Sequence, residues 1–62
     1  MGTVKDVIGF LCDMGVIKGN MIYYSSITHY IESISLILGL SPEESIKKVL
    51  DYLIENGYIM VE

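Results

Sequence analysis

Residues 38–62 read LGLSPEESIKKVLDYLIENGYIMVE, and this stretch decides the fold. Gly39 can adopt the left-handed conformation in which helices commonly end. Ser41 is a favoured N-cap residue, Pro42 suits the first position of a helix, and Glu44 completes a capping box. The stretch therefore predicts the end of one helix, a tight turn and the start of another.

The second of these helices is amphipathic and is followed by a strand. Its apolar residues recur at the i, i+3, i+4, i+7, i+8 spacing of one helical face: Ile46, Val49, Leu50, Leu53 and Ile54. Asn56-Gly57 predicts that the helix ends there, and the residues that follow have the composition of a strand. We predict a helix over 42–56, a strand at Ile59–Val61, and burial of Leu50 and Leu53.

Two further helices are predicted upstream. Thr3 and Asp6 have the spacing of a capping box for a helix over 4–14, whose apolar stripe is Val4, Val7, Ile8, Leu11 and Cys12. Ser25 or Ser26 would cap a helix over 26–38. Its apolar side is Ile27, Tyr30, Ile31, Ile34, Ile37 and Leu38, and Leu36 falls on the opposite side beside His29 and Glu32.

Between these helices, Val16 to Tyr24 read VIKGNMIYY, in which two β-rich pieces flank Lys18-Gly19-Asn20. Either a small hairpin turns at Gly19-Asn20, or one piece alone forms a strand. Met21–Tyr24 is the more regular piece, and we expect it to pair antiparallel with Ile59–Val61. The expected fold is α+β, mainly α, with three helices and a minimal sheet of two or three strands.

Length and composition indicate one small domain over residues 1–62. The chain is 52% apolar, which a domain of this size needs in order to form a core. With a single cysteine it has no disulfide framework, which is typical of a reducing compartment. It has neither an 18-residue apolar run nor a signal-peptide core, so we expect a cytoplasmic protein without membrane insertion.

The residues do not indicate catalysis, a metal or a cofactor. Cys12 is expected in the core of the first helix and His29 on the solvated face of the second, so the two would not meet. A structural zinc site needs more nitrogen and sulfur ligands than this chain has. Glu43-Glu44 is explained by the helix dipole, which favours carboxylates in a first turn. We therefore expect a protein that is not an enzyme.

The residues LGLSPEESIKKVLDYLIENGYI resemble the helix–turn–helix–strand segment of the winged-helix superfamily, and with the first helix included the similarity covers most of the chain. Many such folds bind DNA through the helix after the turn, where Ser45, Lys47 and Lys48 would make the contacts. However, the chain has a net charge of −4 and no Arg, and both lysines have acidic neighbours one turn away. A small DNA-binding transcriptional regulator is therefore the alternative hypothesis.

The leading hypothesis is a non-catalytic protein–protein interaction module. A complete winged helix ends in two strands joined by a loop, whereas this sequence has one strand after its last helix, so the sheet would keep an open edge. The shortened form most resembles the broken winged-helix module of archaeal ESCRT-III cell-division proteins, which implies strand addition by a partner, with Ile59, Met60 and Val61 at the edge. The partner would be another protein or a second copy, and the candidate contact residues are Tyr23, Tyr24, Tyr58, Ile59, Met60 and Val61.

Overall fold

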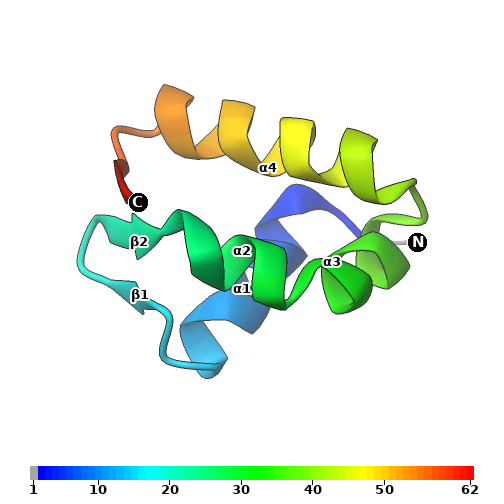
Figure 1. The fold of residues 1–62 in the computed structure, drawn as a ribbon, viewed down its shortest axis with the longest axis horizontal. Helices are drawn as coiled ribbons and strands as arrows, with labels where there is room; N and C mark the ends of the chain where they lie inside the picture. The colour runs from blue at the N-terminus through cyan, green and yellow to red at the C-terminus, as the bar shows by residue number, and fades with distance from the viewer. Residues whose placement is uncertain (1) are drawn as a thin grey trace.

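The computed structural model describes residues 2–62, in which helices pack around one core and a small sheet lies at one end (Figure 1). The elements in chain order are α1 (Val4–Asp13), β1 (Ile17–Lys18), β2 (Met21–Tyr23), α2 (Tyr24–His29), α3 (Ile31–Leu38), α4 (Pro42–Glu55) and β3 (Ile59–Val61). The α+β class, mainly α, is confirmed.

The caps predicted at Thr3, Gly39 and Ser41 form where the sequence places them. The Thr3 side chain accepts a hydrogen bond from the Asp6 backbone N–H, and Asp6 Oδ2 accepts one from the Thr3 N–H at 2.8 Å, which completes a capping box. Ser41 Oγ accepts from the Glu44 N–H at 3.3 Å, and Gly39 ends α3 at a φ of 67°. The Glu44 carboxylate instead accepts a bond from Ser41 Oγ, so this cap is not a reciprocal box.

The helix expected over 26–38 is broken into α2 and α3 at Tyr30, whose backbone lies outside the helical region with φ −100° and ψ 18°. The Tyr30 N–H still donates to the Ser26 carbonyl at 3.2 Å. The α2 helix follows β2 without a loop, so its direction is set by the sheet. The α3 helix packs on α1 and α4, and the break at Tyr30 lets it take that different direction.

The predicted serine cap of this helix is wrong. Ser25 and Ser26 lie inside α2, and the N-cap position is occupied by Tyr23, whose side chain makes no capping bond. Tyr24, expected at the end of a strand, is the first residue of α2. Because tyrosine is favoured in strands, the predicted strand ends at Tyr24, one residue beyond the observed end of β2 at Tyr23.

The three strands form one sheet in the order β1-β2-β3. β1 and β2 are an antiparallel hairpin that turns at Gly19, with φ 63°, so the hairpin alternative is confirmed. β2 and β3 do pair, but they run parallel, and the predicted antiparallel pairing is wrong. Helices α2 and α3 lead the chain away from the sheet and α4 returns it, so β3 enters from the same end as β2 (Figure 1).

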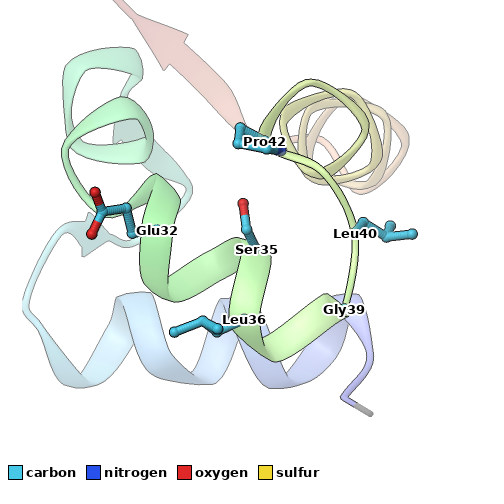
Figure 2. Close-up of a pocket in the computed structure, with 6 residues that line it drawn as sticks. All are labelled: Glu32, Ser35, Leu36, Gly39, Leu40 and Pro42. Carbon is cyan, nitrogen blue, oxygen red and sulfur yellow. The ribbon is translucent and has the colours of Figure 1, made fainter.

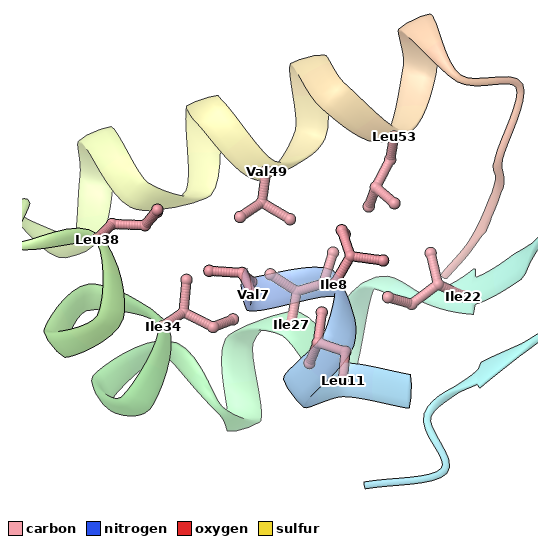
Figure 3. Packing of buried hydrophobic residues seen from close by; sticks show 9 residues of the cluster. All are labelled: Val7, Ile8, Leu11, Ile22, Ile27, Ile34, Leu38, Val49 and Leu53. Atoms are coloured by element: carbon pink, nitrogen blue, oxygen red, sulfur yellow. The ribbon is translucent and has the colours of Figure 1, made fainter. Parts of the chain in front are cut away.

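Buried aliphatic side chains from α1, β2 and the later helices meet between α4 and the rest of the molecule (Figure 3): Val7, Ile8, Leu11, Ile22, Ile27, Ile34, Leu38, Val49 and Leu53. Burial of Leu53 is confirmed, whereas Leu50 is only half-buried. Cys12 and Ile54, both predicted on apolar faces, are exposed. The buried sides of α1 and α4 differ in part from their predicted stripes: Phe10 packs edge-on against Tyr30, and Ser45 lies on the buried side of α4. Ile27, Ile34 and Leu38 are buried, as predicted for the helix over 26–38.

Candidate functional site

The sheet has two faces, and the strand register assigns each residue to one of them. Ile22 is buried in the core and is paired with Ile17 on one side and Met60 on the other. Because side chains alternate along a strand, the neighbours of these three residues point away from the core. We call the resulting surface the outer sheet face; it consists of Lys18, Met21, Tyr23, Ile59 and Val61.

The outer sheet face is apolar except for Lys18. Met21, Tyr23 and Ile59 are 44%, 52% and 53% exposed, and Val61 is half-buried. A sheet that rests on a core with one face normally presents polar residues on the other. Strands with apolar residues on both faces are typical of sheets that are covered on both sides. The outer sheet face is therefore suited to contact with another molecule.

The outer edge of β3 offers unpaired backbone groups. The Ile59 N–H donates to the Asn20 carbonyl at 2.6 Å, so Ile59 directs its backbone groups toward β2. Backbone groups alternate in direction along a strand, and Met60 therefore directs both its N–H and its C=O away from β2. β3 is the last strand in the sheet order and packs chiefly on β2, so no strand of residues 2–62 pairs with it on this side. We call residues 58–62 on this side the β3 edge.

The opposite edge of the sheet is less suited to pairing. β1 contains only two residues, and one of them, Lys18, is exposed. Very short strands and lysine side chains are the usual means by which proteins block an open edge. β3 is longer, and Glu62 is the single charged residue of the β3 edge. The two edges therefore differ, and β3 is the one open to strand addition.

The structure brings together part of the predicted contact set. Tyr23, Ile59 and Val61 lie on the outer sheet face, whereas the Met60 and Tyr58 side chains pack against the core. The Tyr58 N–H donates to the Leu53 carbonyl at 2.9 Å and is unavailable to a partner. Tyr24 is exposed, but it belongs to α2 and not to the strand, so it is not part of the outer sheet face.

Met21 and Lys18 also belong to the outer sheet face and are not among the contact residues predicted from the sequence. Residues 21–23 are apolar throughout, so the sequence shows no alternation there, and only the structure reveals that Ile22 alone is buried. Lys18 is recognisable only once the hairpin register is known, because Lys18 pairs with Met21 across the turn. The strand register therefore adds Met21 and Lys18 to the candidate contact residues, and composition alone does not identify them.

The residues proposed for DNA contact are not all available. Ser45 has no exposed surface, and its hydroxyl makes no hydrogen bond within the described part of the chain, so its predicted role is wrong. Lys47 and Lys48 are exposed, but they line one shallow depression together with Glu44 and Asp51. Charges of both signs therefore share this face of α4, which is a poor match for a row of phosphates.

A hollow of about 520 Å³ lies beside the turn between α3 and α4 (Figure 2). It is lined by Glu32, Ser35, Leu36, Gly39, Leu40 and Pro42. Leu36 is 83% exposed, which confirms its predicted position away from the core. Glu32 is the only carboxylate in the lining, and Ser35 Oγ makes no hydrogen bond within residues 2–62. The hollow therefore offers Leu36, Leu40 and Pro42 as apolar lining beside two polar side chains.

The described residues do not bring metal-ligating groups together. Among residues 2–62, no three His, Cys, Asp or Glu side chains form a cluster that could hold a metal ion. His29 is exposed, as predicted, and its ring lies edge-on to that of Tyr30 with a centroid distance of 4.8 Å. In the same range, none of the helices has the length and hydropathy required to cross a bilayer.

Sequence comparison identifies a similar viral protein. "Uncharacterized protein 69" of Sulfolobus islandicus filamentous virus (isolate Iceland/Hveragerdi) is 62% identical over 61 residues, which cover 98% of each chain. No protein-family model matches the chain, and no solved structure matches it. The resemblance to winged-helix proteins, and to the ESCRT-III module in particular, therefore stays a prediction.

Proposed function

The chain belongs to the same family as this viral protein, and we propose that it is a non-catalytic protein–protein interaction module that binds an extended segment at the β3 edge. The single observation that supports this most strongly is the hydrogen bond from the Ile59 N–H to Asn20. It fixes the direction of the alternation and turns both backbone groups of Met60 outward. Strand addition requires such an edge.

The outer sheet face supports the same proposal. In strand addition, backbone hydrogen bonds give affinity and the side chains beside the sheet give specificity. An added strand would place alternate side chains next to Ile59 and Val61, in a row that continues to Met21 and Tyr23 on β2. These neighbours are apolar, so the segment we propose has apolar residues at alternate positions. We place this module in the cytoplasm, where the exposed thiol of Cys12 would stay reduced.

The test uses peptides selected from a displayed random library on the intact protein. We expect the selected peptides to slow amide hydrogen exchange at Met60 and Glu62, whose N–H groups face outward. Met60→Pro removes the outward donor, and we expect it to abolish peptide binding while the protein stays folded. Met60→Ala is the matched control, because it removes the half-buried side chain and retains the donor.

The opposite result is also informative. Peptides that bind equally well to wild type and Met60→Pro would show that the edge is not the docking site. Peptides that slow amide hydrogen exchange around Leu36 and not at Met60 would show that the binding site is the hollow beside the α3–α4 turn. Circular dichroism of both variants establishes that any loss of binding is not loss of fold.

A further inference from the structure

We infer that the segment bound at the β3 edge is the β3 strand of a second copy, paired antiparallel about a two-fold axis at Met60. This inference rests on the proposed function, because it names the partner of the same edge. The pairing would produce one continuous sheet in the order β1-β2-β3 followed by β3-β2-β1 of the second copy. It is an isologous interface, in which the same residues are used by both copies.

The backbone groups of the β3 edge are complementary to themselves. Met60 presents an outward donor and an outward acceptor, so two copies of Met60 can exchange both bonds as a hydrogen-bonded antiparallel pair. In the same register the Glu62 N–H of one copy faces the outward Tyr58 carbonyl of the other. The Tyr58 N–H already donates to Leu53, so it does not remain as an unpaired donor in the interface. The backbone bonds of this register therefore come from Met60, the Tyr58 carbonyl and the Glu62 N–H of each copy.

The side chains are also compatible in this register. Ile59 of one copy lies opposite Val61 of the other, twice, on the outer sheet face. These are non-hydrogen-bonded positions, where antiparallel side chains approach most closely and β-branched pairs are favourable. Glu62 lies opposite Tyr58 and not opposite its own copy, so no like charges face each other. Pairing about Met60 therefore places apolar side chains opposite apolar side chains, although the chain has an acidic net charge.

The size of the chain favours a copy of itself as the occupant. Domains of this length usually add disulfides, a metal, oligomerisation or unusually dense packing to a small core. The chain has one cysteine, and residues 2–62 contain no cluster of metal ligands. Several large apolar side chains remain exposed near the edge, including Met21, Tyr23 and Ile59. Pairing at the edge brings the exposed Ile59 of one copy beside Val61 of the other, whereas Met21 and Tyr23 lie on β2, one strand farther from the edge, and stay on the surface.

The register can be tested by charge placement. Ile59→Lys/Val61→Lys puts lysines opposite each other at both outer positions, whereas Ile59→Lys/Val61→Glu puts lysine opposite glutamate at both. We expect wild type to dimerise with concentration in analytical ultracentrifugation. We expect the Lys/Lys variant to weaken the dimer by at least ~10-fold and the Lys/Glu variant to recover most of it. Both double variants change only Ile59, which is exposed, and Val61, which is half-buried. Circular dichroism checks that each variant is folded.

Three outcomes would overturn the inference: a wild-type protein that stays monomeric at ~1 mM, a dimer insensitive to Lys/Lys, or a Lys/Glu variant as dissociated as Lys/Lys. A monomer whose Met60 amide is protected by library-selected peptides would refute the second copy as occupant and leave the proposed function standing. A monomer whose Met60 amide is protected by nothing would refute both. Self-association together with protection of Met60 and Glu62 supports both.

Discussion

Leu53 and Ile54 are adjacent in α4 and have opposite environments. Leu53 is fully buried in the core, whereas Ile54 is 67% exposed. We expect Leu53→Ala to lower the free energy of unfolding by about 2–5 kcal/mol, because it removes buried methyl groups and leaves a cavity. In a domain this small, that loss can equal most of the stability. Urea denaturation followed by circular dichroism measures the difference.

Ile54→Ala is the matched control, because it removes a similar side chain one residue away. We expect a change of about 0.5 kcal/mol or less, as for other exposed positions. Equal effects of the two substitutions would mean that α4 is rotated relative to the orientation described above. Unfolding is measured at low protein concentration, so that self-association does not add to the stability.

Ser45 illustrates why the burial of individual side chains was the hardest property to predict from the sequence. A serine in the sequence EESIKK looks like a surface residue, yet it is completely buried and its hydroxyl has no partner within residues 2–62. Its burial depends on how α4 is rotated against α3, which no local pattern determines. The same rotation exposes Ile54, and a corresponding rotation of α1 exposes Cys12.

Among the helices, Gly9 and Gly39 are expected to respond in opposite ways to the same substitution. Gly9 lies inside α1, and a Cβ added there would meet nothing within 4 Å. Gly39 ends α3 at a φ of 67°, a conformation that costs other residues energy. We expect Gly9→Ala to raise stability by about 0.5–1 kcal/mol and Gly39→Ala to lower it by about 1 kcal/mol. Thermal unfolding distinguishes the two, and a stabilising Gly39→Ala would contradict the predicted cap.

The helix ends at Thr3, Gly39 and Ser41 were predictable because their signals are local, whereas the start of α2 at Tyr24 has no side-chain cap to signal it. Thr3 and Ser41 bond to backbone groups three residues away, and Gly39 needs only its own backbone angles. The break at Tyr30 and the parallel direction of β3 depend on packing between distant elements, and the sequence pattern does not contain them. For the site, composition identified the edge strand, whereas the outer sheet face became evident only with the register.

Considered as a whole, the molecule is a weak candidate for nucleic-acid binding. We expect no appreciable affinity for duplex DNA at ~0.15 M salt, because the chain has four lysines, no Arg and a net charge of −4. Lys47 and Lys48 share their face with Glu44 and Asp51. A fluorescence-anisotropy titration at several salt concentrations measures this. Sub-micromolar binding that weakens steeply with salt would instead support the DNA-binding regulator.

The parallel pairing of β2 with β3 affects the order in which parts of the protein fold. Three helices lie between the two strands in the chain, so their contacts are among the most distant in sequence. Contacts of this kind incur a large loop-closure entropy and usually form late in folding. Because β3 directly follows α4 in the chain, we expect it to dock once α4 has packed on α1 and α3. The β3 edge would then exist only on completely folded molecules, and assembly through it would exclude unfinished chains.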